Sequence, residues 1–349
     1  MRTGVNMTIR VTLLSALAMI AAAALILVAV LSDEGAPDAP SHARRPATNV
    51  GAPIKVGVAP VAVAIGAGAI WVVDAARQTL IKVNPRTRAV VGRPRRLSGG
   101  PFAVAVGAGA VWVAAGDGAV RAYDPRTVRP SGRTATVPGA NGLAVGGGGV
   151  WVSSRRAGTV TRIDPRTRHA DPPIRVGRGP ADIAVGLGAV WVANADGASV
   201  SRIDPRRKRA DAAIAIGARQ VLAVTVGAGS VWVVRAAGPD ADRTQLVRVD
   251  PKTREIDGDP VRVPGAVPLD LVAGGGGVWV TNSGGALART AGGRGGVNHV
   301  NLTTRQVTRP ALRVGTRPSA IALGQGGLWV TDEDSGTLTP VMIASRRPR

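Results

Sequence analysis

The sequence predicts an all-β fold, a seven-bladed β-propeller of four-stranded blades with N-terminal strand closure, preceded by one transmembrane helix. Three observations carry this prediction. A tryptophan-centred motif recurs seven times in the 349 residues, a turn signal of the Asp-Pro-Arg-Thr kind follows six of the seven tryptophans, and 21 uncharged residues run from Val11 to Leu31. A motif that returns about every 40 residues is typical of propellers, in which each repeat forms one blade.

The chain before the repeats divides into three parts. Residues 1–10 form a short cytoplasmic segment, 11–31 are long enough as a helix to cross a hydrocarbon core of ~30 Å, and 32–53 are an Ala/Pro-rich linker. Arg2 and Arg10 precede the apolar run and Asp33 and Glu34 follow it, so the positive-inside rule predicts a cytoplasmic N-terminus. A cleaved signal peptide is the alternative, although its apolar core usually has only about 7–15 residues. We therefore expect a single-pass protein of the cell membrane with its repeats on the extracytoplasmic side, or a secreted one if the segment is cleaved.

The repeats occupy residues 54–343, and a basic tail follows at 344–349. Their tryptophans stand 39 to 50 residues apart, at Trp71, Trp112, Trp151, Trp191, Trp232, Trp279 and Trp329. The Gly-x-Gly before each tryptophan suits a hairpin turn with positive φ, and Asp-Pro-Arg-Thr suits a type I turn. Each unit contains four short apolar stretches without helical period, which indicates strands buried on both faces.

Two further features predict ring closure and blade packing. The last unit, 319–343, supplies only three strands, and residues 54–57 have the pattern of a fourth strand. We expect this N-terminal strand to complete the last blade and cover its edge. Ala alternates with Val, Ile or Leu in the first strand of a unit, as at 63–65 and 183–185. We expect this row of small residues to receive the tryptophan of the neighbouring blade.

Composition limits the chemistry of the protein. The chain has no Cys, which excludes disulfides, thiolate metal sites and cysteine nucleophiles. A net charge of +22 attracts polyanions, but Phe102 and Tyr123 are the only Phe and Tyr, and no nucleic-acid-binding motif is present. We therefore expect a monomer that does not bind nucleic acid, with much of the charge compositional. Anionic lipid and cell-wall polymer are the partners that this charge favours.

The two faces of the predicted propeller differ. Extra residues occur only between the second and third strands of blades five and six, around 238–243 and 283–296, and insertions gathered on one face mark a binding side in repeat proteins. On the opposite face, the turns present basic residues that we expect to contact an anionic surface: Arg86, Arg126, Arg166, Arg206 and Lys252. Tolerated drift of the loops and a merely solvated charged rim are the alternatives.

Acidic residues mark a candidate ligand site at the central channel. Asp182 and Asp270 replace a small residue near the start of the innermost strand, where their carboxylates would hold a divalent cation, Ca²⁺ or Mg²⁺, or a basic ligand. Hydrogen bonding to their own loop amides is the alternative. Polar residues three positions after a tryptophan are expected turn caps that also rim this site: Asp74, Asn194, Arg235, Asn282 and Asp332.

The units resemble those of streptogramin lyase-like and YVTN-type bacterial β-propeller repeat proteins over residues 54–343. For the lyase, the resemblance implies a central histidine base beside metal-binding carboxylates. The three histidines, His42, His169 and His299, are not predicted at the inner mouth, so the sequence departs from that pattern. We expect a binding or scaffolding module for a protein, glycan or small ligand. The alternatives are a metal-dependent enzyme of the lyase or lactonase kind that uses Asp182 and Asp270, and a structural protein of the cell envelope.

Overall fold

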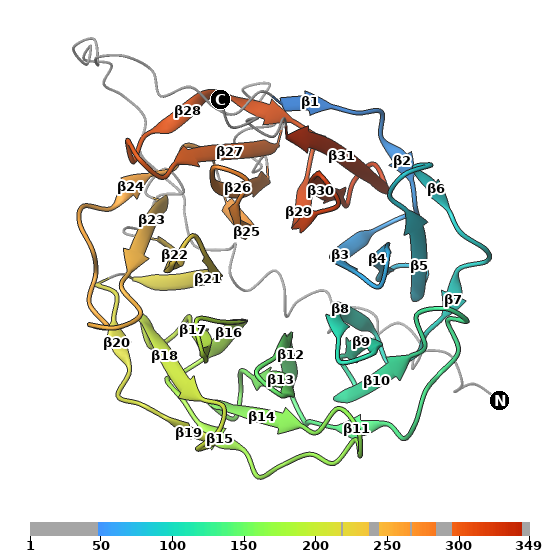
Figure 1. Cartoon of the computed structure of the whole chain (residues 1–349), viewed down its shortest axis with the longest axis horizontal. Coiled ribbons are helices and arrows are strands. Elements are labelled where there is room, and N and C mark those ends of the chain that lie inside the picture. Colours follow the sequence, from blue (N-terminus) through green and yellow to red (C-terminus); the bar gives the residue numbers. More distant parts are fainter. Residues whose placement is uncertain (1–47, 218, 237–243, 266, 284–294, 344–349) are drawn as a thin grey trace, which may run out of the picture. The chain divides into compact units, whose positions relative to one another are not determined.

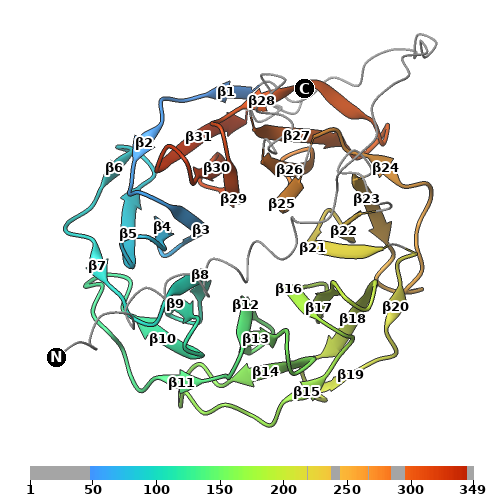
Figure 2. The same cartoon turned by 180° about the vertical axis from the view of Figure 1, so that it is seen from behind.

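The chain folds into seven sheets arranged around a central axis, with the first strand of each sheet nearest the centre (Figures 1 and 2). The computed structural model describes residues 48–217, 219–236, 244–265, 267–283 and 295–343, all within one compact unit, His42–Arg349. The seven-bladed all-β prediction is confirmed. Within these residues, no helix has the length and apolar character that a membrane crossing requires, and the predicted span at 11–31 lies outside them.

The first three blades run in chain order from the innermost to the outermost strand. Blade 1 contains β3 (Pro60–Gly66), β4 (Ala69–Asp74), β5 (Thr79–Asn84), β6 (Ala89–Val90) and β7 (Arg95–Arg96). Blade 2 contains β8 (Pro101–Gly107), β9 (Ala110–Ala115), β10 (Ala119–Tyr123) and β11 (Ala135–Thr136). Blade 3 contains β12 (Ala140–Gly146), β13 (Gly149–Ser154), β14 (Thr159–Ile163) and β15 (Ile174–Arg175).

The next three blades repeat this order. Blade 4 contains β16 (Pro180–Gly186), β17 (Ala189–Asn194), β18 (Ser199–Asp204), β19 (Arg209–Ala210) and β20 (Ile214–Ala215). Blade 5 contains β21 (Gln220–Gly227), β22 (Ser230–Ala236), β23 (Thr244–Val249) and β24 (Val261–Arg262). Blade 6 contains β25 (Val267–Gly274), β26 (Gly277–Ser283), β27 (Gly296–Asn301) and β28 (Val307–Arg313).

Blade 7 joins the two ends of the described chain. Its β29 (Pro318–Gly324), β30 (Gly327–Asp332) and β31 (Thr337–Ile343) come from the C-terminal end, and β1 (Thr48–Val50) and β2 (Ile54–Lys55) both pair with β31. Ile54 lies opposite Leu338, which confirms the predicted closure. Thr48 lies opposite Ile343, so the closing segment begins six residues earlier than predicted, within the expected linker. In blade 1, β6 and β7 likewise pair with the two halves of β5, so β1 and β2 together are one complete, interrupted fourth strand.

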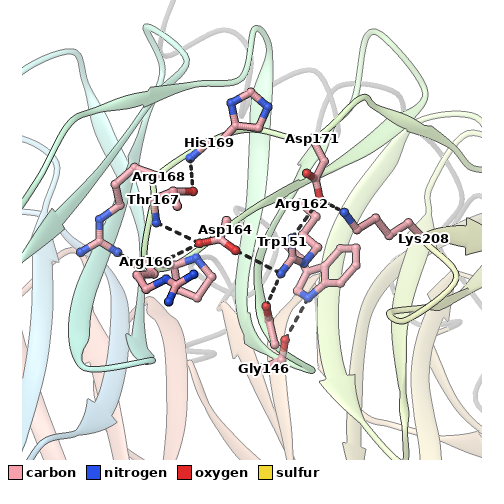
Figure 3. Close-up of polar contacts among 12 residues, drawn as sticks. Gly146, Trp151, Arg162, Asp164, Arg166, Thr167, Arg168, His169, Asp171 and Lys208 are labelled. Atoms are coloured by element: carbon pink, nitrogen blue, oxygen red, sulfur yellow. Dashed lines mark hydrogen bonds and ion pairs between the residues drawn. The ribbon is translucent and has the colours of Figure 1, made fainter.

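Two kinds of turn make the strand connections short. In the hairpin between β3 and β4, Ala67 and Gly68 have φ values of 51° and 73°, as the Gly-x-Gly pattern predicts for a turn with positive φ at both central positions. After the third strand, the Asx side chain closes the Asp-Pro-Arg-Thr turn: Asp164 Oδ1 accepts bonds of 2.9 Å from both Arg166 N and Thr167 N (Figure 3). Hydrogen bonds from these amides lower the pKa of Asp164.

The tryptophans form the joints between blades, in an arrangement that corrects one expectation. Trp71 is fully buried and packs with Val104, Val106, Val111 and Val113 of blade 2. The branched residues of the next blade, not its alanines, therefore receive the tryptophan. Blades 2 to 6 repeat this contact with the blade that follows, and Trp329 of blade 7 packs on blade 1.

The alanines of the innermost strands lie opposite the tryptophans of their own blades. Ala64 lies directly opposite Trp71 on the neighbouring strand of the same blade, and Ala105, Ala144, Ala184 and Ala322 have the same relation to their own tryptophans. A small side chain at that position leaves room for the indole to lean toward the next blade. The core of the protein is thus a ring of interfaces between successive blades.

Candidate functional site

The two ends of the ring are defined by their connections. At one end, the loop face, second strands lead into third strands and each fourth strand leads into the next blade. At the other, the turn face, lie the Gly-x-Gly hairpins and the Asp-Pro-Arg-Thr turns. Innermost strands begin at the loop face, so Asp182 in β16 and Asp270 in β25 both lie near that end of the channel. The pairing of each strand shifts register there, between Pro180 and Asp182 and between Pro268 and Leu271.

Each of these aspartates links two blades. Asp182 Oδ1 accepts a hydrogen bond from its own neighbour Ile183 N, and Oδ2 accepts one from Val224 N in blade 5, both at 2.8 Å. Asp270 repeats the pattern, with Leu271 N at 2.8 Å and Ile321 N of blade 7 at 2.9 Å. The local hydrogen bonds anticipated as the structural alternative are therefore present, and each carboxylate also reaches the following blade.

Both carboxyl groups are hard to ionise. Burial raises the pKa of Asp182 to about 6, against the lowering effect of the two amides. Burial also raises the pKa of Asp270 to about 7, and the negative charge of Asp182 adds to the increase. The two side chains thus act on each other although blade 5 separates blades 4 and 6. At neutral pH much of the pair is therefore ionised, although burial favours the neutral carboxyl groups.

No basic side chain of the described residues relieves this charge. Neither aspartate forms an ion pair with a described Lys or Arg, and only backbone amides lower their pKa values. Both side chains are half-buried rather than sealed. Leu269, next to Asp270, is 40% exposed, a rare exposed large apolar side chain on this face. The arrangement therefore suits a ligand with a cationic group and an adjoining apolar part.

A metal ion would need more ligands than this pair supplies. Within the described ranges, no three His, Cys, Asp or Glu side chains come close enough together to hold one. Each carboxylate oxygen already accepts one amide bond. A Ca²⁺ or Mg²⁺ ion at this place would have to complete its shell with backbone carbonyls and water.

The predicted rim residues hold the connections between blades. Asp74, fully buried, accepts bonds from Val58 N and Arg77 N at 2.7 and 3.0 Å, and Asp332 accepts from Arg317 N and Ser335 N at 2.7 Å. Their carboxylates therefore cap turns, which was one of the two roles expected of them.

The other three members of this set are similarly placed. Asn194 donates to Ser199 Oγ and Ser201 Oγ, and Asn282 is 6% exposed. The Arg235 guanidinium donates to the Ile216 and Gly217 carbonyls and to Gln245 Oε1, and burial lowers its pKa. Because these side chains are buried or hydrogen-bonded to the blades, the candidate site is limited to Asp182 and Asp270, with the exposed Leu269 next to Asp270 in the chain.

The basic residues expected to meet an anionic surface all lie on turns and are exposed: Arg86, Arg126, Arg166, Arg206 and Lys252. The two predicted insertions join β22 to β23 and β26 to β27, on the loop face. Most of the inserted residues, 237–243 and 284–294, lie outside the described part of the chain, as does the tail at 344–349.

Neither described histidine faces the channel. His169 is exposed on the turn after β14 (Figure 3). His299 is buried in β27, where its ring lies 4.3 Å from the Trp279 ring and its Nδ1 lies 3.0 Å from Thr308 Oγ1. His42 lies outside the described residues. The lyase-type central base that the resemblance implied is therefore not supplied by His169 or His299.

Sequence reasoning missed Leu269, and it missed four arginines that line one hollow at the outer edge of blades 1 and 2: Arg93, Arg95, Arg96 and Arg129. The run Arg93-Pro94-Arg95-Arg96 was the available signal. It was obscured because it falls in the fourth strand, the least regular part of every repeat.

No protein-family model matches the sequence, and no curated protein matches it. Solved structures do. A selenomethionine-substituted virginiamycin B lyase from Staphylococcus aureus is 13% identical with a TM-score of 0.69, covering 85% of this chain and 99% of the lyase. A catalytically inactive histidine-to-alanine variant of that lyase, with quinupristin, gives the same identity and score, and its whole chain is covered. Hydrazine synthase from Kuenenia stuttgartiensis is 12% identical over 83% of this chain and 97% of its own, with a TM-score of 0.69. This likeness shows the fold alone: the chain is a seven-bladed β-propeller with the fold of streptogramin B lyase.

Proposed function

We propose that this protein is a membrane-anchored, extracytoplasmic binding module that takes a cationic ligand at the loop-face end of its channel. The single observation that carries the proposal is the pair Asp182 and Asp270, two half-buried carboxylates with raised pKa values and no basic partner among the described residues. An uncompensated buried charge costs stability, and such groups gather at functional sites. A bound cation offsets that cost.

The ligand class follows from the surroundings of the pair. An ammonium or guanidinium group fits two carboxylates that already accept amide bonds, because each oxygen retains a lone pair. Leu269 offers an apolar contact beside them. A basic side chain of a protein, or a small amphipathic amine, has both features. The insertions of blades 5 and 6 are on the same face, where they would extend the contact area.

The proposed orientation rests on the two chain ends. Thr48 and Ile343 are paired at the turn face, so a tether made of residues 1–47 would leave the ring there. The uncharged run at 11–31 is the proposed anchor, and the exposed basic turn residues would then face the anionic leaflet. The loop face would point away from the membrane, toward ligands.

A thermal-shift titration of the full-length protein in detergent tests the binding site. Arginine methyl ester, a guanidinium probe, should raise the melting temperature at pH 8, where both aspartates are ionised, and have little effect at pH 5. Asp182→Asn with Asp270→Asn should abolish the shift. The matched control is Asp117→Asn with Asp196→Asn, which removes two exposed charges from the same face. Equal shifts in both double variants would contradict the proposal.

A second candidate function is a metal-dependent enzyme of the lyase or lactonase kind. Only the acidic pair favours it, since both described histidines lie elsewhere. Titration with Ca²⁺ and with Mg²⁺ separates the two candidates. Stoichiometric metal binding that is lost in the Asp182→Asn, Asp270→Asn variant would favour the enzyme, and binding of the guanidinium probe alone would favour the binding module.

A further inference from the structure

The positive charge of the turn face is unevenly compensated around the ring. Seven residues after the Asx of the turn stand Asp171, Asp211 and Asp257 in blades 3, 4 and 5. Each forms one ion pair with a basic residue of its own blade and one with a basic residue of the next blade. Asp171, for example, lies 2.9 Å from both Arg162 and Lys208 (Figure 3). Asp211 and Asp257 repeat this with Arg202 and Arg254, and with Arg248 and Arg305.

Blades 1 and 2 lack this compensation. The equivalent positions are Val91 and Ser131, so no carboxylate stands where blades 3, 4 and 5 have one. In the same region the sequence gathers four arginines, Arg93, Arg95, Arg96 and Arg129. All four are exposed, and none forms an ion pair with a described residue.

These four arginines line one hollow of about 510 Å³ between the two blades. Arg93, Arg95 and Arg96 come from the outer edge of blade 1, where β7 pairs with β5, and Arg129 follows the turn of blade 2. The other lining residues are Pro94, Thr127 and Val128, so the hollow contains no carboxylate. A concave site with several cations and no anion is a site for a multiply charged anion.

The fold holds the charges together in spite of their repulsion. Lys82 Nζ donates a 2.7 Å hydrogen bond to the Pro125 carbonyl, which fastens the turn of blade 2 to blade 1. Arg95 reaches far enough toward blade 2 to act on Tyr123: burial raises the pKa of this phenol, and the charges of Arg121 and Arg95 oppose the rise. The positive hollow is thus a feature of the blade interface rather than of one loose loop.

We propose that the hollow between blades 1 and 2 binds a linear polyphosphate chain. Guanidinium groups match phosphate oxygens two by two, and four of them in one hollow can follow successive phosphates of a chain. The hollow is recessed at the outer rim, whereas a membrane is flat and would meet the tips of the turns, such as Arg86 and Arg126. A flexible polymer enters such a recess, and a lipid headgroup layer does not.

The test measures binding of the full-length protein in detergent to a long-chain polyphosphate, with inorganic phosphate and anionic vesicles as the other two probes. The variant carries Arg93→Ser, Arg95→Ser, Arg96→Ser and Arg129→Ser. The matched control carries Arg175→Ser, Arg207→Ser, Arg209→Ser and Arg313→Ser, four exposed arginines of other blades, so both proteins lose the same charge.

We expect the polyphosphate Kd of the variant to rise at least about tenfold, and the slope of log K against log salt to fall by about 3, because about 0.7 counterions are released per phosphate contact. The control should keep most of its affinity and slope, and inorganic phosphate should bind more weakly than the polymer. Equal losses in variant and control would overturn the proposal, because diffuse charge would then suffice. Four-arginine-dependent binding to vesicles without binding to polyphosphate would also overturn it, in favour of a lipid contact.

Discussion

Arg168 of blade 3 covers the indole of Trp112 in blade 2, with its guanidinium carbon 4.3 Å from the ring centroid. In other blades a basic residue on the third strand covers the tryptophan of its own blade, as Lys82, Arg202 and Arg248 do at 5.3, 6.0 and 5.9 Å. Blade 2 has Ala122 at that position, directly opposite Trp112. The turn of the next blade therefore supplies the cation that blade 2 lacks. Burial lowers the pKa of Arg168, in keeping with a guanidinium held against the ring.

The contact between Arg168 and Trp112 across the blade boundary can be tested by measuring stability. Arg168→Met keeps an apolar stem over Trp112 but removes the charge, so the free energy of unfolding should fall by about 1 kcal/mol. Arg166→Met, on the same turn but exposed, should change it by less than about 0.5 kcal/mol. Adding Ala122→Lys to Arg168→Met should restore part of the loss. Urea unfolding measures all three, and equal effects at 166 and 168 would contradict the contact.

The bridge at Asp171 should stabilise the joint between blades 3 and 4. Burial by itself would raise the pKa of this carboxyl, but hydrogen bonds from Lys208 and Arg162 outweigh it and lower the pKa. Its stabilising effect is therefore complete above the unfolded pKa of about 4 and is lost as the pH falls through the lower folded value. Asp171→Asn should destabilise the protein by about 1 kcal/mol at pH 7, less in high salt, and less again as the pH falls through the lowered folded pKa. A difference that did not depend on pH would indicate a packing effect instead.

The channel pair has the opposite pH dependence. Folded pKa values of about 6 and 7 lie above the unfolded value, so the wild type is favoured below about pH 4 and loses stability as the pH rises through 6 and 7. Asp182→Asn with Asp270→Asn mimics the neutral pair and removes this loss. The melting temperature of the variant relative to wild type should therefore rise between pH 5 and pH 8 in ligand-free buffer. A constant difference would contradict the raised pKa values.

Truncation measures the contribution of the closing strand. A chain that begins at residue 48 should unfold like the full-length protein, because β1 and β2 are intact. One that begins at residue 57 lacks both strands and Val56, which is 7% exposed and belongs to the cluster of Trp329 and Leu338. We expect this second chain to lose several kcal/mol and to aggregate through the bare edge of β31. Size-exclusion chromatography and urea unfolding distinguish the two, and two monodisperse chains of equal stability would show that closure is dispensable.

Much of the fold could be predicted because its signals are local and repeated. Each Gly-x-Gly needs positive φ, as Ala67 and Gly68 show, and each tryptophan fills one blade interface. The strand at Thr48–Val50 could not be predicted, since three residues in an Ala/Pro-rich segment have no period to read. The direction in which Trp71 leans could not be predicted either. The alternating pattern places Ala64 and its neighbours on opposite faces of the blade, but it does not indicate which face packs on the next blade.

The candidate site, too, could be predicted only in part from the sequence. Asp182 and Asp270 could be found as departures from a small-residue position. Their bonds to Val224 N and Ile321 N depend on a register shift that no local pattern announces. Their mutual effect on ionisation depends on how blades 4, 5 and 6 are placed around the channel, since the two residues are 88 positions apart in the chain. Similarly, Arg129 joins Arg93, Arg95 and Arg96 only when blade 2 is set against blade 1.

The pairing of Thr48 with Ile343 makes the first and last strands of the described chain direct neighbours. The architecture of the ring therefore does not require the chain ends to lie in blade 7. A short peptide joining these neighbours, with new termini cut between two other blades, would yield a circular permutant with every sheet complete. In such a permutant the chain ends would no longer lie in blade 7. A tether attached at the new N-terminus would hold the same seven-bladed ring from a different side.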